Sequence, residues 1–272
     1  MSAPSETVQP TPAAAGFIAA GHAANADMSK APERRTLSVL VDYDNVHEIH
    51  RSKGLEYLAR RIAAAIDNKV LTSVQRFRLR LYGGWFEQVR PTRRAQDLAA
   101  EIAGFPISVA AGGGEGGKAV IVSAELATGL IVEPRLVLTH TVRRRTGPAG
   151  LRCEVPSGLC GVNPSCPLGS VARVLAGTSC TVEGCAAVPA ERLWKLEQKM
   201  VDTLLASDLV YLAIEEGLPV VVVSNDDDIW PAIRLALTGG APVMHIHPIP
   251  GRSTPTHYIV ALPAGYQQAT LN

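Results

Sequence analysis

The sequence lacks a surplus of charge of either sign. Its 272 residues include 26 Lys and Arg and 25 Asp and Glu, which gives a formal net charge of +1 at pH 7. A protein that coats nucleic acid through a uniformly basic surface is therefore excluded, whereas local binding of a polyanion is not, because charge can be segregated along the chain. The hydrophobic fraction of 47% is normal for a globular protein and too high for a chain that is disordered throughout.

Long apolar runs and targeting segments are also missing. The longest weakly interrupted apolar stretch is about 119–132, which is shorter than the roughly 20 residues that a membrane-spanning helix needs. The first residues lack the basic start and the compact apolar core of a secretory signal peptide. We therefore expect a cytoplasmic protein with no membrane partner, in which disulfides do not hold the fold together.

Composition divides the chain into four segments. Residues 1–35 are rich in Ala, Pro, Ser and Gly without any period, and are predicted to be a disordered leader. Residues 146–190 contain all five cysteines and many Gly, Pro and Ser residues, and are predicted to be a cysteine-rich insertion. The remaining segments, 36–145 and 191–272, are predicted to be the two parts of one domain.

Strand and helix patterns alternate in these two parts. Short β-branched or alternating runs predict strands, and apolar residues at helical spacing predict helices. The predicted strands are 36–41, 77–82, 105–110, 136–142, 219–223 and, as the last strand, 243–247, and the predicted helices are 55–66, 93–103, 193–216 and 229–237. This alternation predicts an α/β fold with a mostly parallel sheet flanked by helices.

Carboxylates follow two of the predicted strands. Asp42 and Asp44 end the first strand, and the aspartate run 226–228 follows another. Asp202 lies on the predicted long helix, three residues after Lys199 and therefore on nearly the same face. Sites in parallel sheets form outside the carboxyl ends of the strands, and converging carboxylates repel one another unless a cation neutralises them. Such oxygen ligands suit Mg²⁺ or Mn²⁺; the alternative is that each aspartate merely caps the next helix.

Three motifs, in this order, resemble those of the NYN domains. They are Val41-Asp42-Tyr43-Asp44-Asn45-Val46, Lys199-Met200-Val201-Asp202 continuing to Ala206-Ser207-Asp208-Leu209, and Val223-Ser224-Asn225-Asp226-Asp227-Asp228. NYN domains are PIN-like (Rossmann-like), metal-dependent nucleases that act most often on RNA. The resemblance covers about residues 36–110 and 192–248, and departs from the family at Asn225 and Ile229, where Gly and Phe are usual.

The resemblance implies an endoribonuclease that hydrolyses phosphodiester bonds in RNA, or in single-stranded DNA, with Mg²⁺ or Mn²⁺ as its cofactor. The implied metal-binding and catalytic carboxylates are Asp42, Asp202, Asp226 and Asp228, with Asn45 as a catalytic support of Asp42. Ser224 is implied to hold the turn, and Lys199 to contact a substrate phosphate. Asp208 matches a recurrent family aspartate, but it lies on another helix face than Asp202, so a structural role is equally well supported. Several PIN-like proteins pair, so a homodimer is also allowed.

Two other classes of function stay open from the sequence. The first strand end, Asp42-Tyr43-Asp44-Asn45-Val46, fits the D-x-D-x-[TV] motif of haloacid dehalogenase-like phosphatases. In that class Asp42 is the nucleophile that attacks phosphorus and Asp44 is the acid/base, but Asp202 has no role. The other class is a non-catalytic RNA-binding module that carries the same carboxylates.

Positive and negative charge are separated along the chain. Residues 76–94 contain six arginines and one glutamate, a net charge of +5, whereas residues 201–230 contain seven acidic and no basic residues, a net charge of −7. Guanidinium groups bind phosphates bidentately, so Arg93 and Arg94 are predicted to bind the substrate. The other arginines of 76–94 either contact phosphates as well or line a solvated strand face. The net charge of +1 for the whole chain therefore results from basic and acidic segments that cancel each other.

Aromatic residues lie beside these arginines. Tyr82, Trp85 and Phe86 are candidates for stacking on unpaired bases, and the alternative is that Phe86 belongs to the core. A second basic run, Arg143-Arg144-Arg145, precedes the cysteines.

The C-x-x-C spacing of a zinc knuckle is missing. Four thiolates nevertheless suffice for a tetrahedral structural Zn²⁺ site, and the favoured set is Cys160, Cys166, Cys180 and Cys185. A cross-link suits a segment that has few large apolar residues to build a core. The alternative is that the cysteines are small buried apolar side chains.

Overall fold

Two apolar runs form the centre of the main sheet. β1 (Arg35–Asp42) and β9 (Val220–Val223) pair in parallel, with Val39 opposite Val221. Side chains on both faces of these strands are buried, as is typical of a parallel sheet that helices cover on both sides. The structure is a computed structural model and describes residues 35–113, 117–146, 151–154, 165–180 and 182–271. Apart from residue 35, the predicted disordered leader lies outside the described residues.

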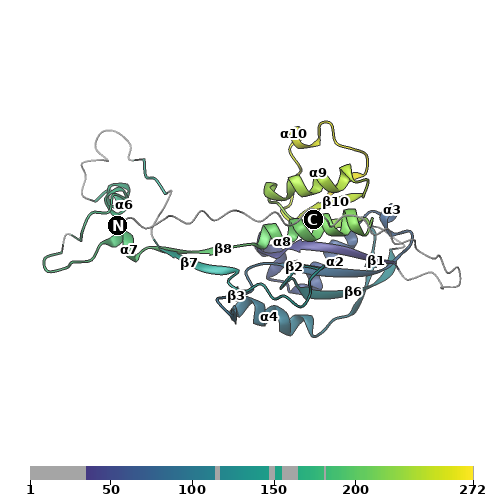
Figure 1. The fold of residues 1–272 in the computed structure, drawn as a ribbon, viewed down its shortest axis with the longest axis horizontal. Helices are drawn as coiled ribbons and strands as arrows, with labels where there is room; N and C mark the ends of the chain where they lie inside the picture. Colours follow the sequence, from purple (N-terminus) through teal and green to yellow (C-terminus); the bar gives the residue numbers. More distant parts are fainter. Residues whose placement is uncertain (1–34, 114–116, 147–150, 155–164, 181, 272) are drawn as a thin grey trace, which may run out of the picture. The chain divides into compact units, whose positions relative to one another are not determined.

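The main sheet has seven strands in the order β11-β10-β9-β1-β2-β6-β5. β1, β2, β6 and β10 of this sheet are labelled in Figure 1. All neighbours pair in parallel except β5, which lies at one edge and is antiparallel to β6. The other strands of this sheet are β2 (Val74–Tyr82), β5 (Ile107–Ala111), β6 (Lys118–Leu126), β10 (Val243–His247) and β11 (Tyr266–Thr270). The predicted α/β fold with a mostly parallel sheet is therefore confirmed.

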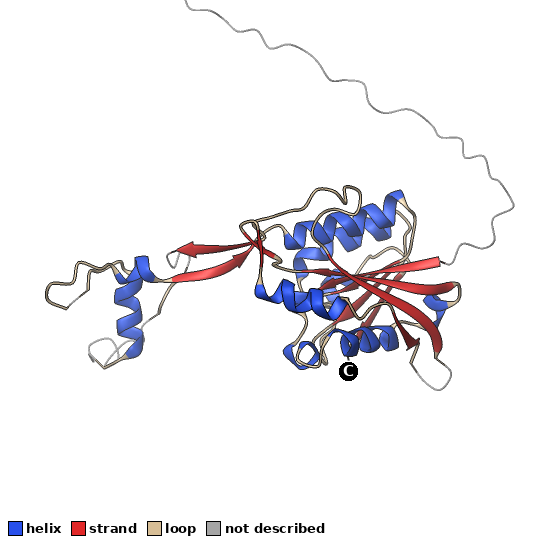
Figure 2. Ribbon diagram, turned by 90° about the horizontal axis from the view of Figure 1, so that it is seen from below, coloured by secondary structure: helices blue, strands red, loops and turns tan. Residues whose placement is uncertain are grey.

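Helices cover both faces of the main sheet (Figure 2). α2 (Leu55–Ala65) and α4 (Arg93–Ile102) pack on one face, and α8 (Val201–Val210) and α9 (Trp230–Thr238) pack on the other. Each buried Leu or Ile on these helices stabilises the fold by roughly 1.5–3 kcal/mol. The shorter helical elements of the domain are η1 (Tyr43–Asn45), α1 (Glu48–Arg51), α3 (Asn68–Leu71), the π-helix η2 (Tyr211–Glu215), η3 (Asp227–Ile229) and α10 (Thr256–Ile259). None of the helices in the described residues is long and apolar enough to cross a membrane.

A second sheet has four strands in the order β4-β3-β7-β8. β3 (Phe86–Glu87) and β4 (Arg90–Pro91) are short, whereas β7 (Val142–Thr146) and β8 (Trp194–Gln198) form an antiparallel pair, here named the ribbon. The chain enters the cysteine-containing segment through β7 and returns through β8. Two helices of that segment are described, α6 (Pro167–Leu175) and α7 (Pro189–Arg192).

The predicted helix 193–216 is wrong. Its first part is the strand β8, and the helix α8 begins only at Val201. Met200 separates the two elements because its backbone has φ of +67°, a left-handed conformation that no helix interior contains. The side chains of 194–198 therefore alternate between two faces, instead of following the helical stripe that their apolar members suggest.

Two strand predictions also need correction. The strand expected at 136–142 lies at Val142–Thr146 instead, because the arginine run 143–145 pairs with β8. The strand at 243–247 is not the last, because β11 pairs with it in parallel. The sequence of β11 hides this strand, since Gln267 and Gln268 interrupt any apolar pattern. The remaining predicted strands and helices are confirmed, with ends shifted by at most three residues.

Candidate metal centre

Three aspartates from different elements meet at the carboxyl ends of the central strands. Asp42 ends β1, Asp202 lies in the first turn of α8, and Asp226 follows β9. One carboxylate oxygen from each lies within 4.8 Å of the other two. These residues are named the acidic trio. Asp42 is buried, Asp226 is partly buried and Asp202 is exposed, so the trio is accessible from solvent on the side of α8.

Asp42 is held by neutral hydrogen-bond donors. Only 2% of the residue is exposed, and its Oδ2 accepts hydrogen bonds from Asn45 Nδ2 at 2.5 Å and from Ser224 Oγ at 2.8 Å. Because both donors bind Oδ2, Oδ1 stays available to a cation. Burial raises the pKa of Asp42 to about 6; the two hydrogen bonds lower it, and the charges of Asp202 and Asp44 raise it again.

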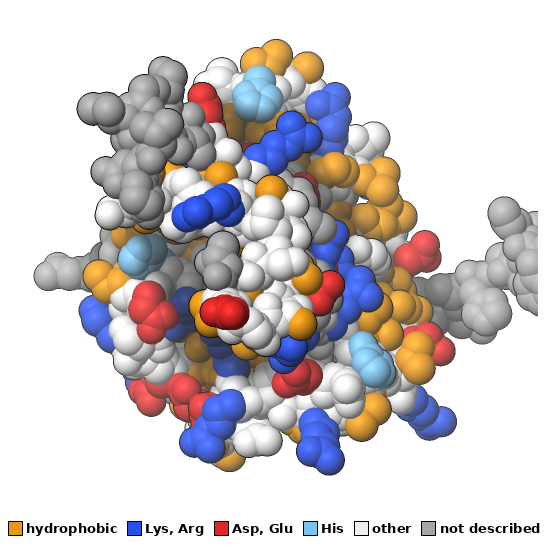
Figure 3. Space-filling view, turned by 90° about the vertical axis from the view of Figure 1, so that its left-hand side faces the viewer, with side chains coloured by type: hydrophobic (Ala, Val, Ile, Leu, Met, Phe, Trp, Pro, Cys, Tyr) orange, Lys and Arg blue, Asp and Glu red, His pale blue; other side chains and the backbone are white. Residues whose placement is uncertain are grey.

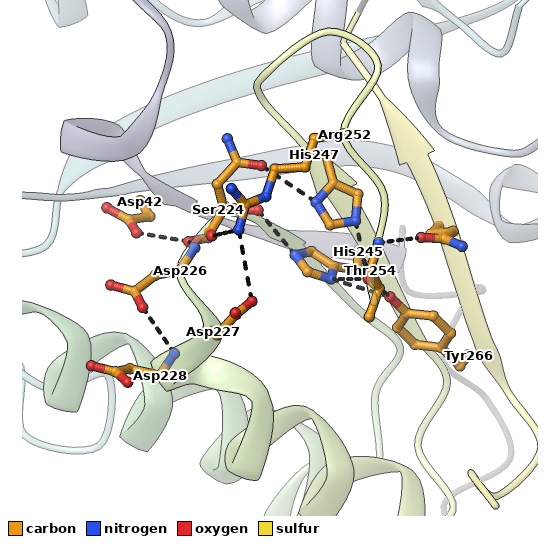
Figure 4. Close-up of polar contacts among 12 residues, drawn as sticks. Asp42, Ser224, Asp226, Asp227, Asp228, His245, His247, Arg252, Thr254 and Tyr266 are labelled. Carbon is orange, nitrogen blue, oxygen red and sulfur yellow. Dashed lines mark hydrogen bonds and ion pairs between the residues drawn. The ribbon is translucent and has the colours of Figure 1, made fainter. Parts of the chain in front are cut away.

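Asp226 is positioned by the turn that follows β9. Ser224 Oγ accepts a hydrogen bond from the backbone N–H of Asp226 at 2.9 Å. Asp226 Oδ1 in turn accepts one from the backbone N–H of Asp228 at 2.8 Å and so caps η3 (Figure 4). The helix-capping interpretation of this aspartate is therefore correct, but capping uses one oxygen and leaves the other for a ligand.

Asp202 lies where a helix N-terminus favours a negative charge. Partial desolvation raises the pKa of its carboxyl group, and the nearby charges of Asp226, Asp228 and Asp44 raise it further. Asp228 is thus close to the trio without belonging to the group whose oxygens converge. Among the ion pairs of the described residues, none joins a Lys, Arg or His side chain to the trio.

The donor set of the trio fits a hard divalent cation. Three carboxylates that repel one another are stabilised by a bound cation, and oxygen ligands are those that Mg²⁺ and Mn²⁺ prefer. The raised pKa values of Asp42 and Asp202 express the same need for a positive charge. Asp42, Asp202 and Asp226 are therefore the residues that could hold such an ion.

Asp44 lies beside the trio but is held by donors of its own. Its carboxylate accepts hydrogen bonds from the Gly84 N–H at 2.9 Å and from Gln198 Nε2, and it pairs with Arg94. A Cβ at Gly83 would lie 2.8 Å from Asp44 Oδ2, so the close approach of this chain segment requires glycine there. Asp44 thereby links the metal centre to the ribbon, a contact that the sequence did not predict.

Two of the predicted basic contacts lie at the edge of the site. Arg94 is bound to Asp44, and the Arg93 side chain is 85% exposed with Asp97 as its partner at 3.0 Å. Lys199 precedes α8 and pairs with Glu197 at 3.3 Å. The prediction that Lys199 shares a helix face with Asp202 is therefore wrong.

Arg80, one of the alternating arginines of β2, is not available to bind a phosphate. Arg80 is buried, and it pairs with Asp208 at 3.0 Å and with Glu125 at 2.5 Å. Tyr82 Oη also donates a hydrogen bond to Asp208 at 2.7 Å, so Asp208 has a structural role. Tyr82 and Trp85 are fully buried, which excludes them as stacking partners for bases.

The described cysteines do not converge on a metal site. Cys153, Cys166, Cys180 and Cys185 are free thiols, and within the described part of the chain no three of them come together as ligands. Cys160 lies outside the described residues. Structural zinc therefore stays a prediction.

A buried polar network behind the trio was missed by the sequence reasoning. His245 on β10 has its Nε2 3.0 Å from the carbonyl oxygen of Ser224, and its Nδ1 lies 3.2 Å from the Tyr266 hydroxyl (Figure 4). Thr254 Oγ1 joins the Tyr266 hydroxyl at 2.6 Å and His247 Nε2 at 3.1 Å. Burial lowers the pKa of His245 to about 4, so its ring is neutral at pH 7. Two histidines at i and i+2 in a buried strand were the available signal.

Comparisons with protein-family models, with curated proteins and with solved structures found no match to this chain.

Proposed function

We propose that this chain is a PIN-like, metal-dependent nuclease that hydrolyses phosphodiester bonds in RNA or single-stranded DNA. The observation that carries the proposal is the acidic trio, which brings three carboxylates within 4.8 Å of one another and has no internal cation among the described residues. A divalent ion bound there supplies a Lewis acid that stabilises negative charge on a phosphoryl group and lowers the pKa of water.

The residues around the trio have distinct tasks in this proposal. Asn45 and Ser224 hold the Asp42 carboxylate in one orientation, so that little reorganisation is needed when a ligand arrives. Arg93 and Arg94 offer guanidinium groups to phosphates on the side of Asp44. Asp228 adds negative charge beside the trio, which strengthens the attraction for a cation.

The geometry favours the nuclease over the phosphatase. A haloacid dehalogenase-like enzyme needs Asp44 to donate and accept a proton, yet its carboxylate is bound by Gly84, Gln198 and Arg94. That class also leaves Asp202 without a role, whereas the structure brings Asp202 to Asp42 and Asp226. A non-catalytic RNA-binding module is the remaining alternative.

A cleavage assay with three substrates tests the proposal. Single-stranded RNA, single-stranded DNA and a generic phosphomonoester are incubated with the protein in Mg²⁺, Mn²⁺ or EDTA. We expect metal-dependent cleavage of a polynucleotide and loss of about 10²–10³ in rate in Asp42→Asn and Asp226→Asn proteins, as is typical when a group that stabilises transition-state charge is removed. Turnover of the phosphomonoester alone would indicate a phosphatase, and binding without cleavage would indicate an RNA-binding module.

Asp208→Asn is unsuitable as a control because Asp208 supports the core. Glu56→Gln is the better control, since it removes a carboxylate from the exposed side of α2, where its partner is Arg60. Its cleavage rate is expected to equal that of the unmodified protein. Equal loss of activity in Glu56→Gln and Asp42→Asn would contradict the assignment of the trio.

A further inference from the structure

The ribbon has two chemically different faces. In the antiparallel register Val142 is opposite Gln198 and Arg144 is opposite Leu196, and Trp194 lies two residues from Leu196 on the same strand, so these side chains share a face. The other face carries Arg143, Arg145, Lys195 and Glu197. There Glu197 pairs with Arg145 at 3.1 Å and with Lys199 at 3.3 Å, so that face satisfies part of its own charge.

The first face exposes an aromatic ring and a cation together. Trp194 is 51% exposed and Leu196 is 60% exposed, although large apolar side chains normally leave solvent. The Arg144 guanidinium lies 4.3 Å from the centre of the Trp194 ring. Trp85 and Trp230 are buried, so Trp194 is the exposed one of the three tryptophans in the chain.

This face continues into a cleft beside the metal centre. The cleft has a volume of about 460 Å³, and its lining includes Asp44, Arg93, Arg94, Val142, Leu196 and Gln198. The base of the ribbon is fixed there, because Val142 packs so closely on Gly84 that a Cβ at Gly84 would overlap the Val142 side chain. Gln198 binds the same carboxylate of Asp44 that pairs with Arg94. The cleft thus reaches from Asp44, which lies beside the trio, past Arg93 and Arg94 to Leu196, which is on the same ribbon face as Trp194.

We propose that this face of the ribbon is the arm that binds a single-stranded polynucleotide and leads it to the acidic trio. A base stacks on Trp194 in place of, or together with, the Arg144 guanidinium, and Arg144, Arg93 and Arg94 contact phosphates. The proposal rests on the nuclease function and adds the element that selects the substrate.

Length and charge favour this occupant. Trp194 lies four residues from Gln198 along an extended strand, or about 13 Å, so only a polymer spans both the ring and the trio. A small phosphomonoester occupies one end at most. Lys and Arg side chains are interspersed with acidic ones on the face seen in Figure 3 rather than gathered in a broad basic patch. Binding by a few arginines and one ring therefore fits a flexible single strand better than a rigid duplex, which is bound through many phosphates.

Binding is tested in EDTA, where a metal-dependent cleavage is off. The full chain is titrated with fluorescently labelled oligouridylate while anisotropy and tryptophan emission are recorded. We expect quenching of the exposed tryptophan, and a Kd that rises about tenfold or more in Trp194→Ala, because one base–aromatic stack is lost. Trp194→Phe should retain most of the affinity. Arg144→Gln should weaken binding and reduce the slope of log Kd against log salt concentration by about 0.7.

Arg234→Gln is the matched control, since it removes the same charge from an exposed position of α9. Unfolding curves of all variants should coincide, because Trp194 and Arg144 are exposed. A Trp194→Ala protein that binds oligouridylate with wild-type affinity would overturn the proposal. The proposal would also be overturned if the only change in Trp194→Ala were a shift from dimer to monomer in light scattering. Metal-dependent cleavage that survives such a result would leave the nuclease function standing. Quenching of the tryptophan emission by oligouridylate, without cleavage of any polynucleotide, would support the ribbon as a binding arm and contradict the nuclease function.

Discussion

Two buried aspartates, one at the end of β1 and one on α8, show how differently the fold treats negative charge. Asp208, only 1% exposed, is bound by the Arg80 guanidinium, the Tyr82 hydroxyl and the Ile131 N–H. Asp42, 2% exposed, receives only neutral donors and has two further carboxylates within 4.8 Å. The first site contains its own cation, whereas the described residues supply none to the second.

The difference separates a structural charge from a functional one. A buried ion pair that satisfies its hydrogen bonds keeps two distant segments together, but it has no capacity left for a ligand. A cluster of like charges costs stability and persists where a ligand repays that cost. The contrast thus favours a cation from outside the chain at the trio.

The largest change in stability is expected when the buried ion pair between Arg80 and Asp208 is broken. Arg80→Met keeps much of the side-chain volume but leaves Asp208 and part of Glu125 without a cation. We expect the free energy of unfolding to fall by about 3–5 kcal/mol, because an uncompensated buried charge remains. Urea unfolding followed by circular dichroism measures this loss.

Arg78→Met is the matched control on the same strand. Arg78 also pairs with Glu125, at 2.9 Å, but its side chain is 44% exposed. An exposed pair contributes about 0–1 kcal/mol, so this variant should unfold almost like the wild type. Equal destabilisation by the two substitutions would show that burial of the Arg80 pair is not what matters.

The polar network behind the trio predicts a pH dependence. The pKa of His245 falls from 6.5 to about 4 on folding, so the unfolded chain binds more protons between these values. The contribution of His245 to the free energy of unfolding is complete above pH 6.5 and is lost as the pH falls toward 4. This contribution is about 3 kcal/mol at most. The difference in unfolding free energy between wild type and His245→Gln, measured from pH 7 to pH 4, should therefore shrink as the pH falls. Asp42 acts with the opposite sign, since its pKa is raised, but its effect cancels in this difference.

The centre of the fold and the convergence of Asp42 and Asp226 could be predicted because both depend on local patterns, whereas Asp202, on a helix, follows no strand and was assigned to the site through the resemblance to NYN domains. β-Branched runs predict buried strands wherever they occur, and aspartates directly after such strands must lie at one sheet edge. The ribbon was missed because Leu196, Met200 and Leu204 mimic helical spacing, while the pairing partner of β8 is some fifty residues away. Arg80 was misjudged for a similar reason, since its partner Asp208 is 128 positions distant and no local pattern announces it.

Binding of a divalent cation at the acidic trio should stabilise the folded protein. At a concentration of Mn²⁺ one hundred times its Kd, a cation that binds only the folded protein adds about 2.7 kcal/mol to stability. We expect a rise in Tm on adding Mn²⁺ and its reversal by EDTA, measured by differential scanning fluorimetry. Asp202→Asn and Asp226→Asn should remove most of this rise.

Asp42→Asn sharpens the same measurement in EDTA. The raised pKa of Asp42 means that its ionised form is disfavoured in the folded protein at pH 7. In EDTA, the free energy of unfolding of Asp42→Asn should therefore exceed that of the wild type by about 1 kcal/mol. The variant should also lose the rise in Tm that Mn²⁺ causes. If Asp42→Asn is less stable than the wild type in EDTA and its Tm still rises with Mn²⁺, then Asp42 is a structural charge like Asp208 and not a metal ligand.

The smallest effect is expected at Asp227, which lies between two aspartates of the site. Its carboxylate is turned toward Arg252, at 3.8 Å, and both side chains are about half exposed (Figure 4). Asp227→Asn should change the unfolding free energy by less than about 0.5 kcal/mol and leave the Mn²⁺ shift intact. Asp226→Asn, one residue earlier, has the same net charge and should lose the shift. Equal losses in both variants would mean that summed negative charge on this loop, rather than the convergence of three particular oxygens, attracts the cation.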